Sequence, residues 1–227
     1  MKYMIHTHPK RSYYVDNYLI PSLEKQGIDS DDIYVVLDTD GAGNLKSFLY
    51  SLKMILTIPV LNEEKGIWHL QDDVIISKDF KKKSEMYAKK DIIINGFVSN
   101  NYNKNALKYT GKQPVKYMWL SMPCIYIPNK YINEFLTWID SIKNLEVNEY
   151  KRRYKSNRHD DFFLYMFMQE VHGKSSCYNL NPNLVDHIDY LIGNSINKPR
   201  DTQVRGFYFK DIDLVEQLER DLKNDIL

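Results

Sequence analysis

The sequence predicts an α/β protein in which helices flank a mostly parallel central sheet. Two observations predict this fold: strand-like and helix-like segments alternate along the N-terminal half of the chain, and the strand-like run at 91–97 is apolar enough to be a central strand. Parallel strands need a long crossover, usually a helix, and the alternation supplies one. The chain has 227 residues, 43% of them hydrophobic, which suits a single domain with a well-buried core.

The first half of the chain carries the alternation. Short apolar runs typical of strands are followed by segments with apolar residues at helical spacing, with turn residues between them. The expected strands are 3–5, 32–37, 67–70 and 91–97, and the expected helices are 11–26, 44–56 and 78–89.

The second half is less regular. Residues 99–116 are rich in Asn, Lys and Tyr without an apolar period, which predicts a long loop that covers a cleft. Residues 161–168 are apolar nearly all round, which predicts a helix buried under the sheet. The other expected elements are strands at 119–127, 177–180 and 184–188, a helix at 128–142 and an amphipathic helix at 211–223. We therefore expect one domain over residues 1–200, with the terminal helix packed on it as an extension, residues 201–227.

Composition excludes several classes of protein. The net charge of +1 gives no reason to expect nucleic acid as a partner, and no segment has the length of a membrane span. Two cysteines, Cys124 and Cys177, are too few for a disulfide scaffold or a zinc cluster and are expected to be buried thiols. Nothing near Met1 resembles a signal peptide, so we expect a cytoplasmic protein.

Two adjacent carboxylates, Asp72 and Asp73, follow the apolar run 67–70. A plain turn or a helix cap is the structural alternative, because Asp is common in both. In an open α/β sheet, however, ligands bind beyond the carboxyl ends of strands, and carboxylate oxygens suit Mg²⁺ or Mn²⁺. The pair therefore indicates a cation site that can neutralise the diphosphate of a nucleotide.

Asp38 ends a second strand-like run and opens the turn at residues 38–43, which contains Asp40 and two glycines. The Asp38 carboxylate can accept hydrogen bonds from a base or a ribose, and glycines allow a ligand to approach the backbone closely. An ordinary turn is the alternative.

Asp160 and Asp161 open the apolar helix, three and four residues after Asn157. This arrangement resembles a helix cap. Because a cap needs only one carboxylate, the other can act as a general base on a hydroxyl; we expect Asp161 in this role, with Asp160 as the rival.

Three histidines are candidate metal ligands. His6 and His8 alternate along one strand without an evident third ligand, so we interpret them as structural. His187 lies in a short apolar run, where a hydrogen-bonded core histidine is the usual case, but it follows the apolar helix late in the chain.

The order of these motifs resembles that of GT-A fold glycosyltransferases, and most closely the small prokaryotic and viral members. The resemblance covers about residues 1–200. In that fold a strand ends in an acid that contacts the nucleoside, which Asp38 matches. A later strand ends in a short acidic metal motif, commonly Asp-x-Asp, and here the matching residues are Gln71, Asp72 and Asp73.

The resemblance extends to two later motifs. An acidic pair opens the helix beneath the acceptor site of that fold, and Asp160 and Asp161 match it. Many members add a late histidine that completes the metal site, which His187 matches.

The resemblance implies a metal-dependent glycosyltransferase that moves a sugar from a nucleoside-diphosphate sugar to the hydroxyl of an acceptor. Attack assisted by a base gives inversion, and retention is the alternative, because some members of that fold lack a base. Asp73 and His187 would hold Mn²⁺ or Mg²⁺. Asp38 and Asp72 would contact the donor, and cations such as Lys198 would share the charge of the departing diphosphate.

Two other functions remain open. Asp38 and Asp40 also resemble the Asp-x-Asp-Gly motif of haloacid-dehalogenase-like phosphatases, although only 33 residues separate Asp40 from Asp73. The second alternative is a non-catalytic module that binds a nucleotide sugar.

Overall fold

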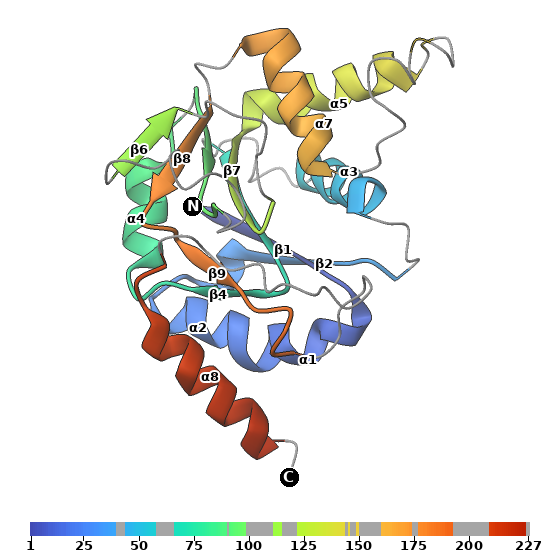
Figure 1. Ribbon diagram of the computed structural model, residues 1–227. Coiled ribbons are helices and arrows are strands. Elements are labelled where there is room, and N and C mark those ends of the chain that lie inside the picture. The colour runs from blue at the N-terminus through green and yellow to red at the C-terminus, as the bar shows by residue number, and fades with distance from the viewer. Residues whose placement is uncertain are drawn as a thin grey trace.

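Figure 1 shows the computed structural model of the chain. It describes residues 1–39, 44–57, 66–89, 91–98, 111–114, 122–143, 145, 149, 160–173, 177–192 and 209–225. These residues form a mixed α/β structure in which helices lie on both sides of a central sheet.

In the described part of the chain, seven strands form the central sheet, in the order β2-β1-β3-β7-β5-β8-β6. They are β1 (Lys2–Thr7), β2 (Ile33–Leu37), β3 (Gly66–Gln71), β5 (Ile93–Asn95), β6 (Gly111–Pro114), β7 (Cys124–Pro128) and β8 (Cys177–Asn181). β1 is parallel to β2 and β3, and β5 is parallel to β8. β7 is antiparallel to both β3 and β5, and β6 is antiparallel to β8. Five strands therefore run in one direction (β1, β2, β3, β5 and β8), and β6 and β7 run in the other. The mostly parallel sheet expected from the sequence is confirmed.

Alternation along the strands divides the apolar side chains between two cores. On β1, Met4 belongs to one core, while Tyr3 and Ile5 belong to the other, because successive side chains point to opposite faces. Figure 1 shows the three helices that cover the first core on one side of the sheet: α3 (Asn44–Leu56), α5 (Asn129–Lys143) and α7 (Asp160–Phe167). The second core is covered by the helical segment after β1, by α4 (Phe80–Tyr87) and by α8 (Ile212–Asp225).

The helical segment after β1 is built from short pieces. They are η1 (Pro9–Arg11), α1 (Ser12–Tyr14), η2 (Val15–Leu19) and α2 (Ile20–Lys25), which together fill the expected helix. The segment ends before Gly27, whose φ of +80° is a left-handed conformation that glycine adopts without strain. A single-turn helix, η3 (Ser30–Asp32), then leads into β2.

Two strands differ from the sequence-based expectation. β6 lies inside residues 99–116, so the prediction of an uninterrupted loop is wrong there. Among the described strands it pairs with β8 alone, through backbone hydrogen bonds, and such an edge strand needs no apolar period. β4 (Val74–Ile76), which we did not predict, pairs with β9 (Val185–His187) in a separate two-stranded sheet. The rest of the expected loop and residues 119–121 of the expected strand lie outside the described residues.

The remaining predictions concern helices and thiols. The apolar helix is α7, which continues as η5 (Met168–His172) and buries Phe163, Leu164 and Phe167 in the first core. The terminal helix is α8, and its Leu218 belongs to the second core. Both cysteines are buried free thiols, as expected.

None of the helices in the described residues combines the length and the apolar character that a membrane crossing requires.

Candidate active site

The register of three neighbouring strands brings the predicted acids to one edge of the sheet. On β1, Thr7 is opposite Leu37 of β2, and His6 is opposite Gln71 of β3. Asp38 is the next residue along β2, and Asp72 is the next residue along β3. The two acids therefore flank the carboxyl end of β1. This edge is where an open α/β sheet binds ligands.

Asp72 is bonded through both carboxylate oxygens. Its Oδ2 accepts hydrogen bonds from the amide of His8 (2.8 Å) and the hydroxyl of Thr7 (3.1 Å), and its Oδ1 accepts one from Nη1 of Arg11 (2.7 Å). Burial and the charge of Asp73 raise the pKa of Asp72, and Arg11 opposes them. Asp72 thus fixes the turn between β1 and the first helix.

Asp73 lies between two cationic side chains. Its Oδ2 accepts hydrogen bonds from Nη1 of Arg11 (2.5 Å) and lies 3.2 Å from Nε2 of His187. Its Oδ1 is buried and has no hydrogen-bond partner among the described residues. Burial alone would raise the pKa of Asp73, but His187 and Arg11 hold it well below its ordinary value. Asp73 is therefore an ionised, buried carboxylate whose Oδ1 accepts no hydrogen bond from the described residues.

His187 bridges two carboxylates. Its Nδ1 lies 3.3 Å from Oδ1 of Asp189, and its Nε2 faces Asp73. The pairing of β4 with β9 causes this contact, because it places His187 opposite Val74, the residue that follows Asp73. Burial disfavours a charged ring, yet the two carboxylates raise the pKa of His187 to about 10. At neutral pH the ring therefore carries both protons and donates to both acids.

A cavity of about 340 Å³ opens beside the carboxyl ends of β1 and β2. Asp38 and His6 lie on its strand side, and Lys46, Ser47 and Tyr50 line it from α3. Burial lowers the pKa of His6, so its ring is neutral at pH 7 and can donate or accept a hydrogen bond. The cavity is in the size range of small-molecule sites and is lined by groups that can bond a nucleoside.

The acidic pair of α7 has an uneven environment. Asp160 is 3% exposed, and its Oδ1 accepts a hydrogen bond from the amide of Asp161 at 3.0 Å. Its Oδ2 is buried without a partner in the described part of the chain. Burial and the neighbouring charge of Asp161 raise the pKa of Asp160 to about 7. Asp161 is half-buried, and its Oδ1 accepts a hydrogen bond from the amide of Phe162.

The donor atoms determine how a cation could be held. Within the residues that the structure describes, no group of three or more His, Cys, Asp or Glu side chains is arranged to hold a metal alone. Asp73 Oδ1 is an orphaned buried oxygen, and His187 Nε2 becomes a second donor once its proton leaves. Mg²⁺ commonly takes one or two protein carboxylates and completes its shell with substrate phosphates and water. These two donors fit a cation that is shared with a phosphate ligand.

The predicted residues are thus only partly brought together. Asp72, Asp73 and His187 form one cluster. Asp38 lies at the same edge of the sheet, in the lining of the 340 Å³ cavity. Asp160 and Asp161 begin a helix that packs against α3 and α5. Lys198 lies outside the described residues.

Sequence reasoning missed Arg11 and Asp189, and it interpreted His6 as structural although His6 lines the cavity. All three residues lie within four residues of a strand end, as Asp38, Asp72 and Asp73 do. Proximity to a strand end was the signal in the sequence that could have indicated each of them as a site residue. Arg11 falls in the predicted amphipathic helix, and neither its burial nor its bond to Asp73 is visible in a local pattern.

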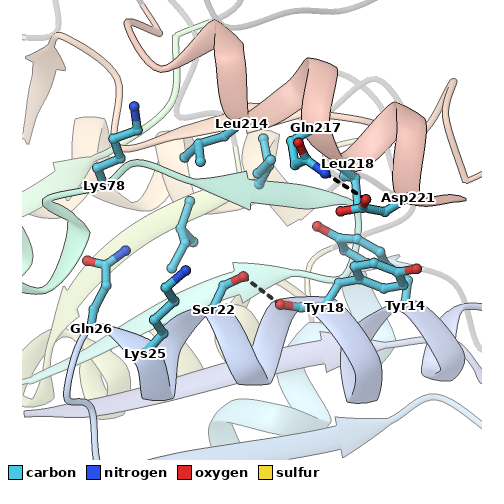
Figure 2. Close-up of a pocket in the computed structure, with 12 residues that line it drawn as sticks. Tyr14, Tyr18, Ser22, Lys25, Gln26, Lys78, Leu214, Gln217, Leu218 and Asp221 are labelled. Atoms are coloured by element: carbon cyan, nitrogen blue, oxygen red, sulfur yellow. Dashed lines mark hydrogen bonds between the residues drawn. The ribbon is translucent and has the colours of Figure 1, made fainter.

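A second, larger cavity of about 550 Å³ lies between the helices after β1, strand β4 and α8. Figure 2 shows Tyr14 and Tyr18 at one end of it and Lys25, Gln26 and Lys78 at the other. The two tyrosine rings are stacked, with centroids 5.7 Å apart. Tyr14 closes the end next to the acidic cluster, because its hydroxyl donates to the carbonyl of Val74 at 2.7 Å.

Comparison with known proteins shows the fold. No protein-family model matches the chain, and no curated protein matches its sequence. The structure is similar to the crystal structure of S. aureus TarS 1–349, with a TM-score of 0.50 and 13% identity over 85% of this chain. This chain spans 62% of the TarS fragment, less than two thirds of its length. The structure is also similar to A197 from STIV, with a TM-score of 0.46 and 15% identity over 83% of this chain and 86% of that one. The GT-A-like α/β fold expected from the sequence is confirmed by the similarity to TarS.

Proposed function

We propose that this chain is a glycosyltransferase that takes a nucleoside-diphosphate sugar and transfers its sugar to an acceptor hydroxyl. One observation carries the proposal: the nucleoside-sized cavity beside Asp38 and the buried Asp73–His187 pair lie at the same edge of a GT-A-like sheet. Similarity to TarS, a glycosyltransferase, supports the class of reaction but not the donor.

The donor would lie across the ends of β2, β1 and β3. Its nucleoside would enter the cavity, where Asp38 accepts hydrogen bonds from the ribose or base and Lys46 supplies a cation at the rim. Its diphosphate would then reach the acidic cluster, because Asp38 and Asp72 flank the end of one intervening strand. Adjacent strands are about 4.8 Å apart, so roughly 10 Å separates the two ends, a distance that a nucleoside diphosphate can span.

Asp73 and His187 are the residues that we propose to hold a Mn²⁺ or Mg²⁺ ion on that diphosphate. When bound, such an ion stabilises the negative charge that develops on the leaving nucleoside diphosphate. Asp189 orients His187 through Nδ1, which leaves Nε2 directed at Asp73. Asp72 keeps the β1 turn in place beside them.

An acid of α7 would remove the proton from the acceptor hydroxyl. We propose Asp160 ahead of Asp161, which reverses the preference drawn from the sequence. A pKa of about 7 suits a general base at neutral pH, and an unpartnered oxygen is needed to accept the proton. Asp161 uses its Oδ1 on the amide of Phe162, as a capping residue does. A single displacement assisted by one base inverts the anomeric carbon.

The proposal is tested by a thermal-shift panel of nucleoside diphosphates and nucleotide sugars, with and without Mn²⁺. A ligand at 100 times its dissociation constant stabilises the fold by about 2.7 kcal/mol, which is about 5–10 °C for a domain of this size. We expect at least one nucleotide sugar to give this shift, and Asp73→Asn to remove the part that depends on Mn²⁺. A panel without any shift would reject the proposal.

The same samples separate the two alternatives. A phosphatase would hydrolyse p-nitrophenyl phosphate, lose that activity in Asp38→Asn and bind no nucleotide sugar. A non-catalytic module would bind the nucleotide sugar but release no nucleoside diphosphate with water or any acceptor tested.

A further inference from the structure

Arg11 is the buried group of the site to which the proposed reaction gives no role. Its Nη1 lies 2.7 Å from Oδ1 of Asp72 and 2.5 Å from Oδ2 of Asp73. Its side chain is 7% exposed, and the two carboxylates are equally buried, so the ion pairs are little screened by solvent. One fixed positive charge therefore holds the two adjacent acids together.

The backbone that carries Arg11 is tied to the strand that follows the acids. Tyr14 lies three residues after Arg11, and its hydroxyl donates to the carbonyl of Val74, the residue after Asp73. At the other side, the amide of His8 is bonded to Asp72. The main chain is thus held on both sides of Arg11, so we expect Arg11 to leave Asp73 by a rotation of its side chain.

The hydrogen bonds of the two carboxylates limit where a cation can bind. Both oxygens of Asp72 are occupied, by donors from Thr7, His8 and Arg11. Asp73 has the spare oxygen, Oδ1, but Arg11 and His187 both lie on its other oxygen. A divalent ion at Oδ1 would sit within a few ångströms of the guanidinium, and like charges that close repel strongly in a buried site.

We propose that Arg11 is the resident cation of the Asp72–Asp73 pair and that a divalent cation binds Asp73 only in competition with it. The inference rests on the proposed function, because it concerns the cation site of the same transferase. On cation binding, Arg11 keeps its bond to Asp72 and gives up Asp73. The guanidinium is then free to bond the diphosphate, for which its planar set of donors is well suited.

The test is a titration of the full chain with Mn²⁺ alone, in which electron paramagnetic resonance reports free Mn²⁺. We expect Arg11→Gln to lower the dissociation constant of Mn²⁺ at least tenfold relative to the wild type, because the charge of the acids is no longer compensated. An unchanged or weaker affinity in a folded Arg11→Gln protein would overturn the proposal, since it would mean that Arg11 only shapes the site.

Two further variants keep the result interpretable. If Arg11→Gln does not fold, Arg11→Lys decides, because the shorter lysine side chain does not carry its ammonium to the position of Nη1, from which Arg11 contacts both carboxylates. We expect Arg11→Lys to tighten Mn²⁺ at least threefold, and no tightening would reject the competition. Tyr14→Phe is the matched control: it removes the bond to Val74 but no charge, so its Mn²⁺ affinity should stay within twofold of the wild type. Equal tightening in Tyr14→Phe would show that a looser helix, and not the charge of Arg11, is the cause.

The titration is independent of the nucleotide panel, so the two proposals can fail separately. Absence of Mn²⁺ binding in both the wild type and the Arg11 variants would overturn the competition and leave the panel to decide on the transferase. Tighter Mn²⁺ binding in Arg11→Gln with no nucleotide binding would support the competition and reject the transferase.

Discussion

His187 Nε2 lies 3.2 Å from Asp73 Oδ2, and both side chains are 8% exposed. The two residues are distant in sequence and meet because β9 pairs with β4 directly after the acidic pair. A cation-binding role and a structural role both require this contact. Replacing His187 therefore measures how much the contact contributes to the free energy of unfolding.

Removing the imidazole should destabilise the protein strongly. His187→Ala leaves Asp73 and Asp189 without their shared cationic partner, and removing one member of a buried ion pair typically costs about 3–5 kcal/mol. We expect a loss near the lower value, because Arg11 still neutralises Asp73. The measurement is urea unfolding at pH 7.

The control for that measurement is an exposed ion pair. Asp213→Ala removes the partner of Lys78, and both side chains are more than half exposed. Such pairs contribute about 0–1 kcal/mol. Equal losses in the two variants would mean that the buried cluster around His187 contributes no more than a surface contact.

Asp38 should determine nucleotide affinity without affecting the cation. Its carboxylate lines the smaller cavity, and hydrogen bonds to charged groups contribute about 1.5–3 kcal/mol, which is a factor of about 10–150 in affinity. We expect Asp38→Ala to raise the dissociation constant of the bound nucleoside diphosphate by at least tenfold, measured by calorimetry. Mn²⁺ binding measured alone should not change.

Thr39→Ala is the matched control for Asp38. Thr39 lines the same cavity and is exposed, so its removal should alter nucleotide affinity less than threefold. If Thr39→Ala weakened the nucleotide as much as Asp38→Ala does, the Asp38 carboxylate would not be a specific contact.

Local patterns predicted most of the fold because each strand buries its own apolar residues. β3 and β7 could be located from Ile67, Trp68 and Ile125, all of them buried in the cores. β6 could not be located, because an edge strand is held by backbone bonds to a single neighbour and its sequence carries no apolar signal.

The site was harder to predict than the fold. Asp38, Asp72 and Asp73 could be proposed because strand ends are recognisable in sequence, and the register then places them at one edge. Arg11 could not be proposed, since its role depends on a contact with residues more than 60 positions away. The different burial of Asp160 and Asp161 was equally hidden, because both begin the same helix.

Gly66 should tolerate no side chain. It begins β3 opposite Pro128 of β7, and a Cβ added there would lie 2.5 Å from the carbonyl oxygen of Ile127 and 2.7 Å from Cα of Pro128. Both neighbours are backbone atoms of a central strand and cannot move aside. We expect Gly66→Ala to destabilise the fold by about 3 kcal/mol or more, as overpacking in a core does, measured by urea unfolding.

Gly27→Ala is the comparison for Gly66. A Cβ at Gly27 would meet only the flexible end of Lys81, at 3.5 Å, so its cost comes from the φ of +80° alone. That conformation costs an L-residue about 1–2 kcal/mol. A loss at Gly27 as large as that at Gly66 would contradict the view that β7 crowds the start of β3.

Asp160 should make stability depend on pH. Burial and Asp161 raise its pKa from 3.8 to about 7, so between these values the native state holds a proton that the unfolded state has released. The unfolding free energy then falls as pH rises from about 4 to about 7, by at most about 4 kcal/mol at 1.36 kcal/mol per pKa unit. Asp160→Asn removes this dependence, so the variant should gain stability relative to the wild type between pH 5 and pH 8 in urea unfolding.

Asp161→Asn is the control, because Asp161 is half-buried and bonded to the amide of Phe162. A constant difference between wild type and Asp160→Asn across that range would mean that Asp160 is ionised in the native state throughout, and that it lacks the proton affinity that we assign to the base.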